Sequence, residues 1–396
     1  MVGRTKVCLV GPSNYLKGGL TDYTCALAHI LDQSDRFDAC VVFLRKFVPE
    51  RLFPGKKRNI EDYPLDLPAG VPSFDGVDWT LIPTLIQAVQ FIRNQRPDVV
   101  LVQWWSSSTI SIYLILSLLL QLKLVRPTPR LIFECHEIFD PKEQESLFLR
   151  TYVKAIAPLL FRGADQLFFH SQKELAEIGR HFRIPSVKTC VVPHVTNQRF
   201  VGKVSRVKGS TKGPLTLMYF GLVRKYKGVP LAIRAFSNLK DQGVLDDQAK
   251  LLVVGDPWED QEAIHQAIKS SAHSQAIHLI ARYVPDSQIP EFFNKADIVV
   301  LPYLRGTQSG VLHIAMQFGK PVVISDVGGF AESLRNYPPK ELVQANNLPS
   351  LEAGVARMVT RLMEGTTASN DMREGGGRLK NNQYLGRLNE LVARLS

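Results

Sequence analysis

The chain has 396 residues, which is too long for one ordinary hydrophobic core and suits two domains. Its 45% hydrophobic and 21% charged residues are ordinary for a soluble globular protein, and no run reaches the roughly 18 apolar residues that span a bilayer. The formal net charge of +11 favours an anionic partner, and on charge alone a nucleotide, a nucleic acid and an anionic membrane all qualify.

The cysteines and histidines show no pattern of a disulfide framework or a metal site. The five cysteines are scattered and lie mostly in apolar runs, which is typical of reduced, buried thiols in a cytoplasmic protein. The nine histidines have no metal-ligand spacing. Residues 1–6 lead directly into a strand-like run and do not resemble a signal peptide. We therefore expect a cytoplasmic protein.

Strand-length apolar runs alternate with helix-length segments almost throughout, which predicts parallel sheets covered by helices on both faces. In the first half the predicted strands are Val7–Val10, Ala39–Leu44, Val99–Gln103, Leu131–Cys135, Gln166–His170 and Thr189–Val192. The predicted helices there include Asp22–Leu31, Pro83–Asn94, Ile110–Leu124 and Gln172–Phe182. The hydroxyl of Ser171 suits the N-cap position of the last of these helices.

The second half repeats the alternation. Its predicted strands are Leu215–Phe220, Lys250–Val254, Ala276–Ile280, Ile298–Leu301 and Val322–Ser325. Its predicted helices include Val229–Leu239, Gln288–Lys295, Gly310–Gly319 and Leu351–Met363. Two α/β domains of similar build are therefore expected.

Two segments have the composition of breaks between structural units. Residues 201–214 are basic, free of acidic side chains and rich in Gly and Ser, which predicts a linker. The run Gly375–Gly377 predicts a second break, which leaves Arg378–Leu395 as a separate helix. The predicted organisation is a first domain over residues 1–200, a linker over 201–214, a second domain over 215–374 and a C-terminal helix within 375–396.

Two cations follow the first strand of the second domain. Gly221 permits a sharp exit from that strand, Arg224 and Lys227 follow in a loop, and Lys227-Gly228 enters an amphipathic helix. Cations at the mouth of a parallel sheet, with a helix N-terminus behind them, form an anion site whose natural ligand is a diphosphate. A solvated loop of basic residues is the alternative.

A second loop of the same domain is rich in small polar residues and opens a helix. It runs from Pro302 to Gly310, and we select Thr307, Ser309 and the backbone amide of Gly310 as phosphate contacts, because a loop of this kind presents free amides to an anion.

The first domain offers three weaker signals. The pair Gly18-Gly19 precedes a helix and lets the backbone approach a ligand, although a plain turn is as good an interpretation. His136 follows a strand directly, at the sheet edge where ligands bind in α/β folds. Trp104-Trp105 ends the preceding strand and suits either core packing or a stacking platform for an acceptor sugar.

The segment Phe220–Phe236 and the string from Ala315 to Glu332 resemble the retaining, nucleotide-sugar-dependent glycosyltransferases of the GT-B fold, family 4. The resemblance covers nearly the whole chain and is strongest between Phe220 and Glu332. It implies an α/β fold of the GT-B type: two Rossmann-like parallel-sheet domains with an interdomain cleft, and a last helix that crosses back onto the first domain.

The resemblance also implies roles for single residues. Arg224 and Lys227 would grip the donor diphosphate, although the usual Arg position next to the glycine holds Leu222. Gly18 and Gly19 would face the cleft, and His136 would contact a hydroxyl of the donor sugar. The residues implied near the nucleotide are Gly255, Arg282 and Tyr283.

One family feature is absent. The two positions of the usual Glu pair hold Gly306 and Ile314, as in a subset whose loop reads Thr-Gln-Ser-Gly. In this subset Gln308 is placed to supply the sugar contact and Glu332 to help at the ribose. The departure puts the identity of the donor in doubt and leaves room for a degenerate enzyme.

The resemblance implies transfer of a sugar from a nucleoside diphosphate to a hydroxyl of a glycan or lipid-linked acceptor. No cofactor is expected, and no metal ion, because cations and helix termini replace it and no Asp-x-Asp occurs. Three alternatives remain: a sugar-nucleotide epimerase, a catalytically silent protein that binds a partner enzyme or a glycan, and a nucleic-acid binder. No nucleic-acid-binding module is recognisable, so we expect no nucleic-acid partner.

A basic and apolar segment, Arg45–Arg58, suggests where such an enzyme meets a surface. Its cations and interleaved apolar side chains suit peripheral contact with an anionic membrane, whereas a solvated loop is the alternative. This segment favours an enzyme at the inner face of the membrane that extends a lipid-linked or cell-envelope glycan.

Overall fold

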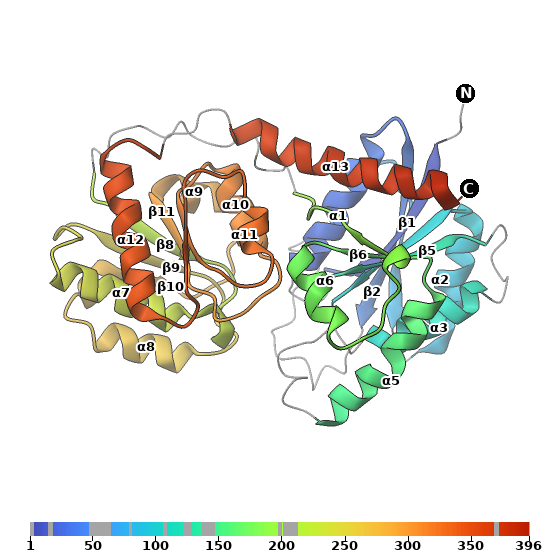
Figure 1. Ribbon diagram of the computed structural model, residues 1–396, viewed down its shortest axis with the longest axis horizontal. Coiled ribbons are helices and arrows are strands. Elements are labelled where there is room, and N and C mark those ends of the chain that lie inside the picture. The colour runs from blue at the N-terminus through green and yellow to red at the C-terminus, as the bar shows by residue number, and fades with distance from the viewer. Residues whose placement is uncertain are drawn as a thin grey trace. The chain divides into compact units, whose positions relative to one another are not determined.

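A computed structural model describes residues 4–14, 19–46, 65–78, 81–105, 109–121, 128–136, 147–196, 200, 213–367 and 372–395. The chain divides into two compact units. The first unit comprises Met1–Asn197 together with Lys380–Ser396, and the second comprises Gln198–Leu379. Each unit is a parallel sheet with helices on both faces (Figure 1).

The first unit is built on a seven-stranded sheet in the order β3-β2-β1-β4-β5-β6-β7. Every paired register in it is parallel. The strands are β1 (Thr5–Pro12), β2 (Phe37–Lys46), β3 (Ser73–Asp78), β4 (Val99–Trp104), β5 (Arg130–Cys135), β6 (Gln166–Phe169) and β7 (Thr189–Val191). The order reverses between β1 and β4, and the crevice at such a reversal is where α/β folds bind ligands.

Alternate residues of the central strands supply two separate cores, as the two-residue period of a strand requires. Cys8 and Val10 pack with helices α2 (Ile82–Gln95), α3 (Ile110–Leu119) and α5 (Leu147–Gly163) on one face. Val7 and Leu9 pack on the other face with α1 (Gly19–Asp32) and with the end of α13 (Met372–Leu395). Helix α6 (Gln172–Gly179) completes the unit.

The end of α13 is part of the first unit from Lys380 onward. Its apolar side chains Tyr384, Leu388 and Leu391 belong to the same core as α1. The amide of Asn381 binds the backbone of Thr196 on both sides, with Thr196 N donating to its Oδ1 at 3.0 Å and its Nδ2 donating to Thr196 O at 3.2 Å. The C-terminal residues therefore complete the core of the first unit.

The second unit has a six-stranded parallel sheet in the order β10-β9-β8-β11-β12-β13. Its strands are β8 (Thr216–Phe220), β9 (Lys250–Val254), β10 (Ile277–Ile280), β11 (Ile298–Leu301), β12 (Val322–Ser325) and β13 (Lys340–Val343). Its helices are α7 (Val229–Asp241), α8 (Gln261–Lys269), α9 (Ile289–Lys295), α10 (Gly310–Gln317), α11 (Phe330–Ser333) and α12 (Leu348–Met363). The order reverses between β8 and β11, which makes this pair the switch point of the sheet.

All eleven predicted strands are confirmed, with ends that differ by a few residues. Ser171 is confirmed as an N-cap, because its Oγ accepts a hydrogen bond from Glu174 N at 3.1 Å. The prediction missed β3, β13, α5, α8 and the short α11.

Two predicted boundaries were wrong. The helix predicted over Ile110–Leu124 ends at Leu119 as an α-helix. The C-terminal helix begins at Met372, six residues before the predicted start, and continues through Gly375–Gly377. A glycine costs a helix about 1 kcal/mol relative to alanine, but it does not forbid helical geometry. Among the described residues, no helix is long and apolar enough to cross a membrane.

Candidate functional site

The switch point of the second sheet holds the two predicted cations. The loop after β8 carries Arg224 and Lys227, and the loop after the neighbouring strand β11 runs through Thr307 to Gly310. Because the carboxyl ends of parallel strands meet at one edge of the sheet, the structure brings these two loops together, as the sequence predicted. The contact is tight: Leu304 N donates to Tyr226 O at 2.7 Å.

A glycine allows this close approach. Gly228, which follows Lys227, has a φ of 67° and occupies the left-handed region. A Cβ added there would overlap the carbonyl oxygen of Pro302 and lie 3.2 Å from its carbon. The backbone of the first loop therefore sits directly on the end of β11, which fixes where the Lys227 side chain starts.

The two cations rest on aromatic rings. The Lys227 Nζ lies 3.7 Å from the ring centroid of Tyr303 and 4.9 Å from that of Tyr226. The Arg224 guanidinium carbon lies 5.2 Å from the centroid of Tyr226, and its Nε lies 3.7 Å from Oε1 of Glu259. Cation–π contacts hold both side chains in place, and the carboxylate of Glu259 pairs with Arg224.

Tyr303 links these cations to the N-terminus of α10. Its hydroxyl lies 3.1 Å from the Ser309 Oγ, and burial raises the pKa of Tyr303 to about 12. Ser309 caps α10, because its Oγ accepts from Leu312 N at 3.2 Å, and its side chain is buried. The hydroxyl of Ser309 thus serves the helix cap, while the exposed Gly310 begins the first turn, whose amides an anion can use.

The other predicted residues of this unit surround the same sheet edge. Thr307 O accepts from Gly329 N at 3.0 Å, and Gln308 Oε1 accepts from the Ser333 hydroxyl at 3.4 Å. That hydroxyl places Gln308 beside α11, the helix that carries Glu332. The loop after β12 therefore supports the loop after β11.

Gly255, Arg282 and Tyr283 follow β9 and β10, on the other side of β8. Gly255 is buried against the backbone of Gly221, with its amide donating to Ile280 O at 3.0 Å. The exposed Arg282 donates to Gln288 Oε1 at 2.8 Å and to Tyr283 O at 3.2 Å.

In the first unit, Gly18 lies outside the described residues, and the exposed Gly19 begins α1. Trp104 is fully buried and packs edge-on to Phe133, at 6.2 Å between ring centroids, so its core interpretation is confirmed. Trp105 is half-buried and lies 6.2 Å from the ring of Tyr113.

His136 lies in a buried polar cluster at the carboxyl edge of this sheet. Cys135 of β5 lies beside Trp104 of β4 and Phe169 of β6. His136 and His170, the next residues after Cys135 and Phe169, are therefore neighbours at the ends of adjacent strands. His136 Nε2 donates to Gln103 Oε1, and His136 Nδ1 lies 3.2 Å from His170 Nε2. A donor hydroxyl could contact the ring of His136 only by displacing one of these partners.

A carboxylate lies beneath the histidines. Glu134, fully buried in β5, accepts from the Tyr23 hydroxyl at 2.5 Å and from Gln103 Nε2 at 2.7 Å, and its Oε1 lies 3.6 Å from His170 Nε2. Burial raises the pKa of its carboxyl to about 7, against the hydrogen bonds from Tyr23 and Gln103, which lower it. Burial also lowers the pKa of His170 to about 4 and that of His136 well below its usual range.

Sequence reasoning missed Glu134, His170 and His194. A usable signal was present in Phe133-Glu134-Cys135, where one carboxylate interrupts an apolar strand. A histidine also follows each of three successive strands, directly after β5 and β6 and three residues after β7.

Two family models match the chain over adjoining halves. Residues 18–194 match the glycosyl transferase 4-like domain, and residues 202–376 match the glycosyl transferases group 1. The chain belongs to the GT-B glycosyltransferases of the family 4 type. This membership confirms the resemblance in its general form, whereas the Thr-Gln-Ser-Gly subset stays a prediction.

This glycosyltransferase is similar to characterised members of several kinds. It is 26% identical to the D-inositol 3-phosphate glycosyltransferase of Streptomyces scabiei over 48% of this chain and 44% of that one. It is 24% identical to the lipopolysaccharide 1,2-N-acetylglucosaminetransferase of Salmonella typhimurium over 64% of this chain and 63% of that one. The matches thus span less than two thirds of these relatives' own lengths.

Solved structures share the fold along the whole chain. HepE of Anabaena, in complex with UDP and glucose, has a TM-score of 0.70 at 17% identity, covering 99% of both chains. The sucrose-phosphate synthase of Thermosynechococcus elongatus has a TM-score of 0.66 at 16% identity, covering 99% of this glycosyltransferase and 100% of that chain. The predicted α/β fold with two Rossmann-like parallel sheets is confirmed.

Proposed function

We propose that this chain is a retaining glycosyltransferase that moves a sugar from a nucleoside-diphosphate sugar to an acceptor hydroxyl. The observation that carries the proposal is the meeting of Arg224, Lys227 and the N-terminus of α10 at the switch point of the second sheet. Two cations and a helix N-terminus supply what a diphosphate requires. The family membership supports it, as do the UDP and UDP-glucose named in the HepE complexes.

The proposed reaction needs stabilisation of charge more than it needs a base. The bond between the anomeric carbon and the diphosphate oxygen breaks, and the acceptor oxygen bonds to the same face of that carbon. The proton of the acceptor hydroxyl goes to the departing diphosphate. Arg224, Lys227 and the first-turn amides of α10 stabilise the negative charge that grows on the diphosphate. Because these groups offset the negative charge on the diphosphate, we propose no metal ion there.

Further contacts are assigned as part of the proposal. Gln308, held beside α11, takes the role of the sugar-binding carboxylate, and Glu332 lies on the short helix that would approach the ribose. Arg282 and Tyr283 would contact the base, and His136 a sugar hydroxyl.

A screen of donors tests the proposal directly. The protein is incubated with UDP-, GDP-, ADP- and dTDP-sugars, with and without simple glycan acceptors, and products are followed by mass spectrometry. We expect transfer or slow hydrolysis with at least one donor, which releases the nucleoside diphosphate. Proton NMR of the product then reports the anomeric configuration, and an inverted product would contradict the retaining mechanism.

A catalytically silent glycosyltransferase-like protein is the second candidate, and one observation favours it. The position of the first usual Glu holds Gly306, whose φ of 156° is rarely adopted by other residues. Its carbonyl lies so close to Gly328 that a Cβ there would overlap it. The backbone conformation at position 306 therefore disfavours a side chain there. Nucleotide binding by calorimetry without turnover of any donor in the screen would support this candidate.

The acceptor is proposed to be a lipid-linked or cell-envelope glycan, reached by peripheral contact with the inner face of the membrane. The names of relatives support this class, since they include a glycolipid mannosyltransferase and a lipopolysaccharide transferase. The segment Arg45–Arg58 would make the contact; its residues from 47 onward lie outside the described part of the chain, and Arg45 is exposed at the end of β2.

Vesicle binding tests this contact. We expect the protein to co-sediment with anionic vesicles and poorly with neutral ones, because each basic residue near an anionic surface contributes about 1 kcal/mol. Changing Lys56, Lys57 and Arg58 to Glu should abolish the binding. The same reversal at Lys173, Arg180 and Arg183, three exposed cations of the first unit, is the control and should reduce binding much less. Failure of the wild type to bind either vesicle would point to a soluble acceptor.

A further inference from the structure

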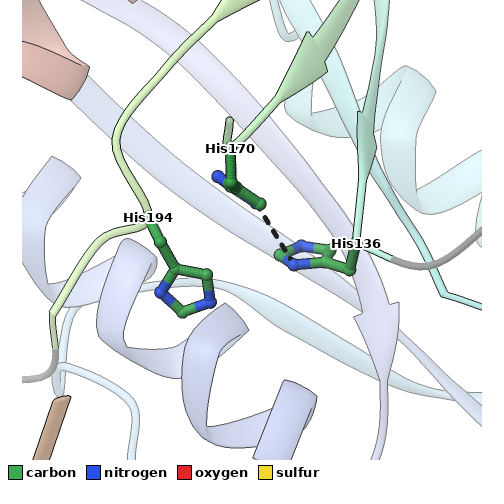
Figure 2. Close-up of side chains that lie close together, drawn as sticks. All are labelled: His136, His170 and His194. Atoms are coloured by element: carbon green, nitrogen blue, oxygen red, sulfur yellow. Dashed lines mark hydrogen bonds between the residues drawn. The ribbon is translucent and has the colours of Figure 1, made fainter. Parts of the chain in front are cut away.

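Three imidazole rings converge in the first unit, on residues far apart in the sequence. His136 follows β5, His170 follows β6 and His194 follows β7 by three residues. One nitrogen from each ring lies within 4.8 Å of the corresponding nitrogens of the other two. Figure 2 shows the three rings close together, with the hydrogen bond between His170 and His136 marked.

The hydrogen bonds fix the tautomers of two of these rings. His136 Nε2 faces the Oε1 of Gln103, whose Nε2 donates to Glu134, so the His136 proton is on Nε2 and the lone pair is on Nδ1. His194 Nδ1 lies 2.9 Å from the Val195 carbonyl oxygen, so its proton is on Nδ1 and its lone pair is on Nε2. A histidine that donates from one nitrogen to a protein acceptor, leaving the other for a metal ion, is the arrangement of metal-binding sites.

We propose that His136, His170 and His194 bind one divalent transition-metal ion, with Zn²⁺ as the best-fitting ion. Three imidazole nitrogens suit Zn²⁺ in chemistry and in number, with a fourth position left for water or a carboxylate.

The distances agree with this assignment. Ligand nitrogens at 2.0–2.1 Å from a tetrahedral zinc ion are about 3.4 Å apart. His136 Nδ1 and His170 Nε2 are 3.2 Å apart, so this pair needs almost no movement. The most distant pair has to close by little more than about 1 Å, which a change in a side-chain torsion of the half-buried His194 provides.

The surroundings also suit a cation. Oε1 of Glu134 lies 3.6 Å from His170 Nε2, so one buried carboxylate offsets part of the charge of the ion. His170 has to move its proton from Nε2 to Nδ1 on binding, because Nε2 is the nitrogen that faces His136 Nδ1 and Glu134. The ligands stay neutral imidazoles throughout, and no proton is lost. The three histidines belong to the first unit, whereas the diphosphate site belongs to the second. With Nε2 on Gln103 and Nδ1 on the ion, His136 would bind the ion in place of the sugar hydroxyl proposed for it above.

Metal titration of the full chain tests the proposal. The protein is stripped with a chelator and titrated with Co²⁺, whose visible absorption reports coordination geometry, and then with Zn²⁺ in competition. We expect one Co²⁺ per chain with the intense absorption of four-coordinate cobalt, displaced by one Zn²⁺. Zn²⁺ should also raise the melting temperature, because it binds the folded state.

Two variants locate the ion. His194→Gln, at a half-buried loop position, should weaken binding at least a hundredfold and abolish the rise in melting temperature. His273→Gln is the control, since His273 is also paired with an acceptor, Asp241 at 2.8 Å, but lies in the second unit; it should bind as the wild type does. No stoichiometric binding by the wild type, a weak six-coordinate spectrum, or equal binding by His194→Gln would each overturn the proposal. Glycosyl transfer is not a readout of this test, so its outcome is independent of the proposed function.

Discussion

Replacing Arg224 or Lys227 with alanine is expected to lower kcat/KM for glycosyl transfer by about a hundred- to a thousandfold each. The reason is that each cation forms a charge-assisted contact that strengthens as negative charge grows on the leaving diphosphate, and loss of one such contact has an effect of this size. The measurement is the initial rate with the donor identified in the screen. Because the two cations act on one group, the double variant should lose less than the product of the single losses.

A matched control lies between them. Lys225 occupies the same short 3-10 turn, Lys225–Lys227, but its side chain is exposed. Within the described residues, the cations over the rings of Tyr226 and Tyr303 are those of Arg224 and Lys227. Lys225→Ala should keep activity within about threefold of the wild type, since an exposed charge contributes little. Wild-type rates in the Arg224→Ala, Lys227→Ala double variant would contradict the proposal that these two residues bind the donor diphosphate.

Gly255→Ala is expected to reduce the stability of the second unit by about 3 kcal/mol or more, the scale of severe overpacking. Its Cβ would overlap the carbonyl oxygen of Gly221 and lie 2.8 Å from the carbonyl carbon, so backbone opposes backbone. Its φ of 158° adds strain for any other residue. Both glycines end central strands, and the amide of Gly221 is bound to Val254 O at 3.0 Å, so neither backbone can yield alone.

Gly243→Ala is a control that separates the backbone strain of a positive φ from steric overlap of the added Cβ. Gly243 has a φ of 71°, but no atom lies within 4 Å of a Cβ built there, so its substitution should cost only about 1 kcal/mol. Hydrogen exchange of peptides that cover β8 and β9 measures both effects within the second unit. Equal protection in the two variants would show that the contact between Gly255 and Gly221 relaxes freely.

The strands that the sequence predicted are those with the most apolar residues. β8, β11 and β12 are buried along most of their length, so their residues form continuous apolar runs. The missed strands lie at sheet edges: Ser73–Asp78 contains two aspartates and a glycine, and Lys340–Val343 begins with two charged residues. An edge strand has one neighbour and need not be apolar, so its sequence carries little pattern.

The two candidate sites also differ in how far the sequence could predict them. Arg224, Lys227 and Gly228 are close in sequence and follow one strand, so the pattern was readable. The histidine cluster was not, because His136 and His170 are 34 residues apart and meet only when a crossover lays one strand beside the next. Metal-ligand spacing is defined along the chain, whereas a parallel sheet brings ligands together across it.

The contribution of α13 to the first unit has a consequence for how the protein is made. The core beside α1 includes Tyr384, Leu388 and Leu391, and the Thr196 backbone is matched by Asn381. On the ribosome the other strands and helices of this unit emerge first, yet the residues that close its core are translated only after the whole second unit. Until then the second unit can fold as an uninterrupted stretch of chain, while the first exposes an apolar surface. The unit at the N-terminus is therefore the later of the two to be completed during biosynthesis.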